Sequence, residues 1–239
     1  MCRLMGFASK VDTSINEIAG AHFPQFALLA DRHKDGWGFS SDSELVKEIA
    51  PARTSPRFDE VIAENEKAAL LHFRFASTGI NVQESNSHPF MRDGISFIHN
   101  GTIKPADTLN QFVDADLLAK TTGTTDSERY FFAVLTQLRS KPIAEAFLQT
   151  VRNIKETGNF SSLNAMVLTP QFYIVVSEHD NSRIPKEEPA DYYRLSYKAD
   201  SDGVIVASSG WDQTDWDEIP NHTMMVVDRT TLSRDFIAI

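Results

Sequence analysis

The sequence is poor in cysteine, in long apolar runs and in positive charge. Cys2 is the only cysteine, which excludes an intramolecular disulfide and leads us to expect a reducing, cytoplasmic location. No stretch approaches the ~18 apolar residues that a membrane-spanning helix needs, and the first residues lack the basic-then-apolar layout of a signal peptide. The net charge of −10 argues against nucleic acid or an anionic membrane as the main partner.

The chain is long enough, at 239 residues, for one large domain or two small ones. Hydrophobic residues make up 41% of it and charged residues 23%, which is the balance of a globular protein with a buried core. No internal repeat, low-complexity tract or linker divides the sequence. We therefore expect one domain over residues 1–239.

Hydrophobic periodicity predicts strands near both ends of the chain and helices in the middle, which indicates an α+β protein rather than alternating βαβ units. The clearest helix begins at Thr125-Asp126-Ser127-Glu128, a capping-box pattern, and a second spans 143–154. Asn100-Gly101 is a strong hairpin-turn signal and would end a strand over 95–99. Other strands are predicted over 2–9, 70–76, 164–168, 171–176, 195–198, 203–208 and 224–228, with short helices following Ser14, Pro24 and Pro56.

Cys2 lies where removal of Met1 would leave it as the N-terminal residue. It would then carry a thiol and a free α-amine, whose ordinary pKa values are about 8.5 and about 8. An amine close to neutrality can accept the thiol proton, which is the pairing of nucleophile and base in N-terminal nucleophile enzymes. The alternative is a small buried apolar residue without a chemical role.

Three further polar features lie at the ends of predicted strands or helices, where catalytic groups tend to lie. Arg74 can bind a carboxylate through two parallel hydrogen bonds, and a structural salt bridge is the alternative. Asp126 suits an ammonium group, or it stabilises the N-terminus of its helix, or both. Asn100-Gly101 indicates, by itself, only a turn.

The histidines and glycines give no sign of a metal or nucleotide site. His72, His88 and His99 lack the paired short spacing of metal ligands, and neither a second cysteine nor an HExxH pattern accompanies them, which favours structural histidines. Gly36 and Gly38 flank a tryptophan without the third glycine and the helix of a dinucleotide fingerprint, and there is no phosphate loop.

Six stretches, in order along the chain, resemble the class II glutamine amidotransferases, which are N-terminal nucleophile hydrolases. Any one of them would be a weak signal, but six in order are specific. The segment 203–209, with Trp216 and Ile219-Pro220, is similar to the C-terminal part of the stand-alone, YafJ-like or γ-glutamyl hydrolase members. The resemblance implies a four-layer αββα sandwich with two antiparallel sheets. The six stretches are Met1-Cys2-Arg3-Leu4-Met5-Gly6, Asp35-Gly36-Trp37-Gly38, His72-Phe73-Arg74-Phe75-Ala76-Ser77-Thr78-Gly79, His88-Pro89-Phe90, His99-Asn100-Gly101-Thr102-Ile103 and Thr125-Asp126-Ser127-Glu128.

The resemblance also implies a role for each matching residue. Cys2 would be the nucleophile, and the side chain of Asn100 and the backbone N–H of Gly101 would form the oxyanion hole. Arg74 would bind the α-carboxylate of glutamine and Asp126 its α-ammonium group.

Four more residues are implied in substrate binding. Ser77 and Thr78 would lie along the substrate, and Arg3 and Trp37 would help to shape the site. Two positions depart from the family pattern, since Phe75 stands where several synthase-linked members carry Trp, and Thr78 where they carry His. These two departures do not affect the residues implied in hydrolysis. They concern any role of positions 75 and 78 in closing the site or in coupling it to a synthase.

The implied reaction is hydrolysis of the side-chain amide of glutamine, or of a γ-glutamyl amide, through a Cys2 thioester, with release of ammonia or an amine. It needs no metal or organic cofactor. The 239 residues scarcely exceed one glutaminase domain, so any ammonia-accepting synthase is expected to be a separate chain. A chain that retained Met1 would lack the free amine, and would instead be a non-catalytic glutamine-binding or regulatory subunit.

Overall fold

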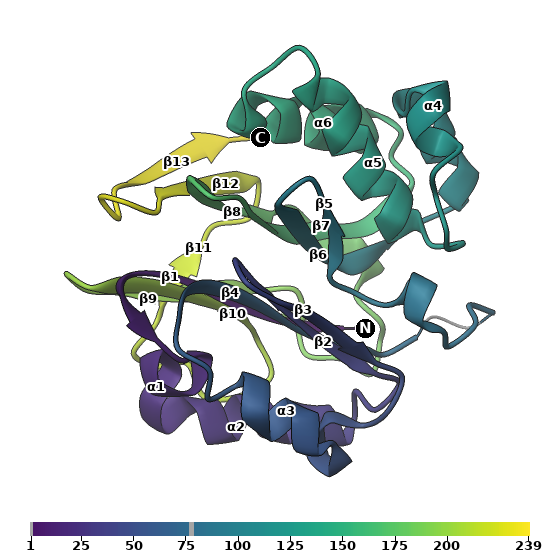
Figure 1. The fold of residues 1–239 in the computed structure, drawn as a ribbon. Helices are drawn as coiled ribbons and strands as arrows, with labels where there is room; N and C mark the ends of the chain where they lie inside the picture. Colours follow the sequence, from purple (N-terminus) through teal and green to yellow (C-terminus); the bar gives the residue numbers. More distant parts are fainter. Residues whose placement is uncertain (1, 77–78) are drawn as a thin grey trace.

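The computed structural model describes residues 2–76 and 79–239. Two antiparallel β-sheets pack face to face, and helices cover the outer face of each sheet (Figure 1). The arrangement confirms the predicted α+β class and the four-layer αββα sandwich.

The first sheet has seven strands in the order β11-β9-β10-β1-β4-β2-β3. Its central strand β1 pairs antiparallel with β10 on one side and with β4 on the other. Side chains alternate across β4, so Leu70 faces the second sheet whereas Leu71 packs against the helices. The strands are β1 (Arg3–Thr13), β2 (Trp37–Ser41), β3 (Leu45–Glu48), β4 (Glu66–Phe73), β9 (Leu195–Ala199), β10 (Gly203–Ser208) and β11 (Asp217–Ile219).

The second sheet has six strands in the order β13-β12-β8-β7-β6-β5. The turn predicted at Asn100-Gly101 is wrong, because both residues lie inside β6, opposite Asn164 and Leu163 of β7. Pairing between distant strands overrides the local turn signal here. The strands are β5 (Phe90–Arg92), β6 (Ile95–Ile103), β7 (Phe160–Leu168), β8 (Phe172–Ser177), β12 (Thr223–Asp228) and β13 (Arg234–Ala238).

The two longest helices, α5 (Asp126–Leu138) and α6 (Ile143–Glu156), cover the second sheet, and α1 to α3 cover the first (Figure 1). Thr125 caps α5, since its Oγ1 accepts a hydrogen bond from the Glu128 amide at 3.2 Å. The other half of the predicted capping box is wrong, because the Glu128 carboxylate instead accepts hydrogen bonds from the amides of Thr122 and Gly123. The shorter helices are α1 (Ile15–Ala19), α2 (Phe23–Ala27), α3 (Pro56–Val61) and α4 (Ala115–Leu118), and 3₁₀ turns span Gly20–His22, Leu28–Asp31, Ala52–Thr54, Glu84–Asn86, Ala106–Phe112 and Asn181–Arg183.

Buried apolar side chains form three layers, one between the sheets and one between each sheet and its helices. Removal of these side chains from water is the main favourable contribution to folding. Between the sheets the layer includes Leu4, Leu70, Ile98, Met166 and Met225. The strands that carry the polar groups are therefore held by apolar side chains packed on both faces of each sheet.

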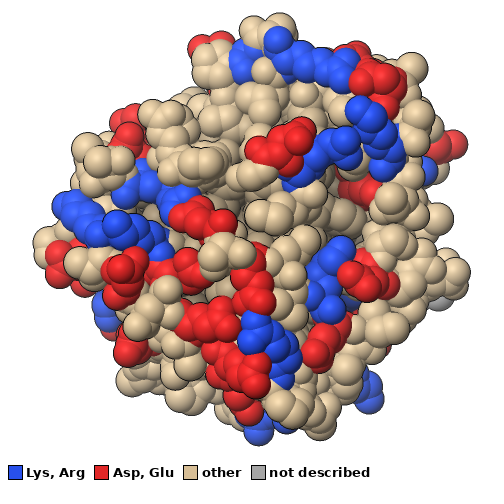
Figure 2. Space-filling model, in the orientation of Figure 1, with Lys and Arg blue, Asp and Glu red and all other residues tan. Residues whose placement is uncertain are grey.

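The surface carries charges of both signs. On the face shown in Figure 2, Lys and Arg side chains lie among Asp and Glu side chains and form no continuous basic field. Ion pairs such as Arg139 Nη1 with Asp114 Oδ2, at 2.6 Å, are exposed and contribute little to stability. Within residues 2–76 and 79–239, no helix is long and apolar enough to cross a bilayer.

Candidate active site

The pairing of β1 with β4 brings Cys2 beside Arg74. Arg3 lies opposite Phe73 in this antiparallel pair, so the residue before the first and the residue after the second are neighbours at the same end of the sheet. The Cys2 Sγ lies 3.7 Å from the Phe75 carbonyl oxygen, to which the thiol donates a weak hydrogen bond. The two strand ends therefore place a thiol and a guanidinium together.

The environment of Cys2 favours the protonated thiol. Burial raises the pKa of the Cys2 thiol, and the positive charges of Arg74 and Arg3 oppose this shift without cancelling it. A thiol is a poor nucleophile until it loses its proton. Any reaction of Cys2 near neutral pH therefore needs a base that takes up this proton.

Within the described residues, one hydrogen bond holds the Arg74 side chain, and a second terminal nitrogen is left without a partner. Its side chain is 4% exposed, and one terminal nitrogen donates to the Asn81 carbonyl oxygen at 3.1 Å. The other terminal nitrogen has no hydrogen-bond partner among the described residues. Burial lowers the pKa of the guanidinium, although arginine stays charged in proteins. A buried cation with unused donors is suited to an anionic group of a ligand.

Asp126 is the first residue of α5 and is 7% exposed. Its Oδ2 accepts a hydrogen bond from the Ile103 amide at 2.6 Å, and its Oδ1 accepts one from the Ser127 amide at 2.9 Å. These contacts fix the carboxylate between β6 and α5. Because each oxygen can accept more than one hydrogen bond, the fixed carboxylate can still bind a cation.

The oxyanion-hole candidates lie on β6. Asn100 is 1% exposed, and neither polar atom of its side chain has a hydrogen-bond partner within the part of the chain that the structure describes. A Cβ atom at Gly101 would collide with the Ser162 carbonyl oxygen and would lie 2.6 Å from His99 Nε2, so only glycine fits there. The amide of Asn100 is thus a free donor beside a close backbone approach.

One cavity, open to solvent, brings most of these groups together. Four predicted site residues line it, namely Cys2, Arg74, Gly101 and Asp126. Asn100 does not line this cavity, although the adjacent Gly101 does. Its other lining residues, which the sequence reasoning did not single out as site residues, are Phe75, Ala76, Ile80, Asn86, His88, His99, Thr125 and Ser127.

The structure separates the two residues expected to shape the site. Arg3 donates from Nη1 to the Cys2 carbonyl oxygen at 3.1 Å, and its guanidinium lies 4.7 Å from the centre of the Tyr192 ring, so it holds the backbone of Cys2. Trp37 packs against Phe58 on the helix-covered face of the first sheet and does not line the cavity. Ser77 and Thr78 lie outside the described residues.

Three buried histidines lie at the cavity: His88 and His99 line it, and His72 packs against His88. The rings of His72 and His88 lie 4.2 Å apart, and His99 contacts Ser127 Oγ at 2.9 Å and the Ser162 carbonyl oxygen at 3.0 Å. Burial lowers the pKa of all three, that of His72 to about 3. Among the residues with described positions, no three His, Cys, Asp or Glu side chains are grouped to hold a metal ion.

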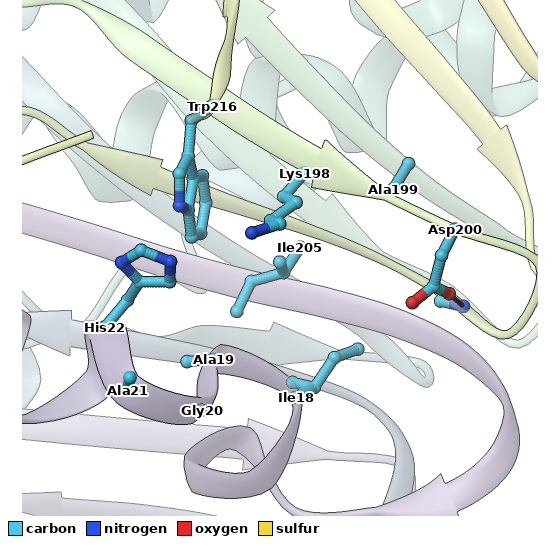
Figure 3. A pocket seen from close by; sticks show the side chains of 11 residues that line it. Ile18, Ala19, Gly20, Ala21, His22, Lys198, Ala199, Asp200, Ile205 and Trp216 are labelled. Carbon is cyan, nitrogen blue, oxygen red and sulfur yellow. Dashed lines mark hydrogen bonds between the residues drawn. The ribbon is translucent and has the colours of Figure 1, made fainter. Parts of the chain in front are cut away.

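A larger hollow lies elsewhere on the first sheet, between the α1–α2 connection and the β9–β10 turn. Figure 3 shows His22, Trp216 and Lys198 around it, with Ile18 and Asp200 at its other end. It contains no cysteine and none of the predicted site residues. Convergence of chemical groups, rather than size, therefore identifies the cavity at Cys2 as the candidate active site.

Comparison with known proteins identifies the family to which the chain is similar. A family model described as "Glutamine amidotransferases class-II" matches residues 1–235. The "Probable glutamine amidotransferase DUG3" of Saccharomyces cerevisiae is 24% identical over 265 residues, which cover 86% of this chain and 73% of that protein.

Solved structures share the fold at low sequence identity. The glutamine aminotransferase class-II domain protein from Silicibacter pomeroyi has a TM-score of 0.67 at 15% identity, over 100% of both chains. The glutamine phosphoribosylpyrophosphate amidotransferase from B. subtilis has a TM-score of 0.64 at 16% identity, over 98% of this chain and 49% of that one. Both likenesses support the sandwich of two sheets, and the family model spans nearly the whole sequence. The chain belongs to the class II glutamine amidotransferases.

Proposed function

We propose that the protein hydrolyses the side-chain amide of glutamine, or of a γ-glutamyl amide, with Cys2 as the nucleophile. The observation that carries this proposal is the single cavity lined by Cys2, Arg74, Gly101 and Asp126. A thiol, a cation, a backbone donor and an anion around one space match the amide, the α-carboxylate and the α-ammonium group of glutamine.

Recognition would use the two opposite charges. The unused donors of Arg74 bind the α-carboxylate, and the Asp126 carboxylate accepts hydrogen bonds from the α-ammonium group. Because both side chains are more than nine-tenths buried, their interactions with a bound ligand are weakly screened by water. Substrates that lack either charge are expected to bind poorly.

Because the Cys2 thiol is protonated, the reaction would begin with the removal of its proton. Once Met1 is removed, the α-amine of Cys2 takes the proton from Sγ, and the thiolate attacks the amide carbon. The negative charge that develops on oxygen is stabilised by Asn100 Nδ2 and the Gly101 amide. The proton passes to the leaving nitrogen, ammonia or an amine departs, and a thioester remains. Water then attacks the thioester, its proton returns to the thiol, and glutamate is released.

Two destinations exist for the nitrogen product. The protein either releases it to solvent as a hydrolase, or passes ammonia to a separate synthase chain. Two assays without any partner chain distinguish these uses. One measures the release of ammonia from glutamine, and the other measures the hydrolysis of γ-glutamyl peptides. We favour hydrolysis of glutamine or a γ-glutamyl amide without a partner.

Intact mass spectrometry before and after incubation with diazo-oxo-norleucine tests the proposal, because this glutamine analogue alkylates such a nucleophile. We expect loss of Met1 and one adduct on Cys2, and no adduct in the Cys2→Ala variant. A processed protein that gains no adduct would refute the proposed glutamine site. A protein that retains Met1 and gains no adduct would instead support a non-catalytic, glutamine-binding subunit.

A further inference from the structure

Asn86 lies in the wall of the Cys2 cavity and joins its two sides. Its side chain is 1% exposed, so its amide is fully removed from bulk water. Nδ2 donates to the Asn81 carbonyl oxygen at 3.1 Å and to Thr124 Oγ1 at 3.3 Å, and Oδ1 accepts from the Thr124 amide at 2.8 Å. The side-chain amide of Asn86 thus binds two segments of the chain. One contains Asn81, which contacts Arg74, and the other contains Thr124, which lies close to Asp126 in sequence.

The Asn81 carbonyl oxygen leads to Arg74. It accepts a hydrogen bond from the Arg74 guanidinium at 3.1 Å as well as the one from Asn86. A carbonyl oxygen has two lone pairs and can accept both. Because this is the one hydrogen bond that orients the guanidinium among the described residues, the position of the Asn81 carbonyl oxygen sets the direction of the free donors of Arg74.

Thr124 leads to Asp126. It comes directly before the N-cap Thr125, and Asp126 is the first residue of α5. The preceding Gly123 packs closely on the Asn86 loop, since a Cβ atom there would collide with the Ser85 carbonyl oxygen and lie 2.5 Å from Asn86 Oδ1. The amide of Asn86 therefore fixes where α5 begins relative to the loop that holds Arg74.

We propose that Asn86 is a positioning residue that sets the separation between Arg74 and Asp126. It thereby makes the site selective for ligands with a free α-carboxylate and α-ammonium group. The inference rests on the proposed function, in which these two residues bind the amino-acid end of glutamine. It adds that their spacing is fixed by one buried amide rather than by either charged residue alone.

Two substitutions disturb this link in different ways. Asn86→Ala removes the hydrogen bonds of the side-chain amide, whereas Gly123→Ala keeps the amide but forces the two segments apart. Asn221→Ala is the matched control. The Asn221 amide joins two segments away from the cavity in the same manner, through 2.9 Å hydrogen bonds to the His179 amide and carbonyl groups.

Two reagents for Cys2 separate recognition from reactivity. The rate of alkylation by diazo-oxo-norleucine depends on the amino-acid end of the reagent, whereas alkylation by iodoacetamide depends only on the thiol. We expect Asn86→Ala and Gly123→Ala each to slow the first reaction by about tenfold, the loss typical of one good hydrogen bond. Both variants should keep the wild-type rate with iodoacetamide, and Asn221→Ala should keep both rates.

The outcomes distinguish the inference from the proposed function. A wild-type protein that has lost Met1 and still does not react with diazo-oxo-norleucine refutes the proposed function itself. If the wild type reacts with diazo-oxo-norleucine, and Asn86→Ala and Gly123→Ala react with it as fast as the wild type does, the positioning role is overturned. A parallel loss with both reagents would also overturn it, because Asn86 would then act on the fold or on the thiol. If Asn86→Ala does not fold, Gly123→Ala alone decides.

Discussion

Substitution of His72 by phenylalanine is expected to make the protein more resistant to mild acid. His72 is fully buried on β4 against the ring of His88, and neither ring nitrogen has a hydrogen-bond partner among the described residues. Burial, with a smaller effect from the charge of Arg74, lowers the pKa of His72 to about 3. In the unfolded chain the ordinary value of about 6.5 applies.

The sign follows from where the protons bind. Between about pH 6.5 and pH 3 the unfolded chain takes up a proton at position 72 and the folded protein does not, so stability falls as the pH falls. The cost is about 1.4 kcal/mol per pH unit below 6.5, and therefore about 2 kcal/mol at pH 5. His88 and His99, whose pKa values burial also lowers, add to the acid sensitivity of the wild type.

Urea unfolding at pH 7, 6 and 5, followed by circular dichroism, measures this effect. The free energy of unfolding of the wild type should fall by about 2 kcal/mol more than that of His72→Phe between pH 7 and pH 5. Leu70→Val, on the same strand and face, is the control that should change stability by the same amount at every pH. If the wild type and His72→Phe lose stability in parallel, the ring of His72 takes up its proton in the folded protein as readily as in the unfolded chain, which would refute this prediction.

Three further predictions concern the candidate site. Arg74→Lys should raise KM for glutamine more than it lowers kcat, because lysine cannot make the paired hydrogen bonds to a carboxylate, and an unchanged KM in steady-state assays would count against the clamp. Asn100→Ala should lower kcat by about 10²–10³ with little change in KM, and a smaller loss would argue against its place in the oxyanion hole. The rate at which iodoacetamide alkylates Cys2 should still rise above pH 8.5, because burial raises the pKa of the thiol, and a plateau below pH 8 would contradict this.

Several features could be predicted from the sequence because their signals are local or strongly periodic. The apolar stripe of α5 and its cap at Thr125 are examples. The sequence does not predict the short edge strands β3 (Leu45–Glu48) and β13 (Arg234–Ala238). Their side chains are only partly buried in β3 and largely exposed in β13, and each strand depends on a paired neighbour. The turn predicted at Asn100-Gly101 is wrong for a related reason. The close approach of Gly101 to Ser162 arises only when β6 and β7 pair, and the local sequence does not show this pairing.

The candidate site was predictable only through the resemblance, and only in part. Cys2, Arg74 and Asp126 come from three separate segments, and nothing in their spacing places them around one cavity. The side on which Trp37 lies follows from the alternation of β2, which directs it to the helices. Asn86 carries no signal at all in the sequence, since its importance lies in contacts with Asn81 and Thr124 that exist only in the folded chain.

The antiparallel register of β1 and β4 has a consequence for how such proteins diverge. Cys2 and Arg74 are neighbours because Arg3 lies opposite Phe73, and a slip of one residue would turn the side chains of one strand to the other face. The connection between the strands contains β2, which pairs with β4 in register, and β3, which pairs with β2, but its helices α1 to α3 pair with no strand. Evolution can lengthen, shorten or rewrite these helical segments while inheriting the pairing unchanged. Distant descendants of one ancestor would then share the ends of two strands long after most of the intervening residues have been replaced.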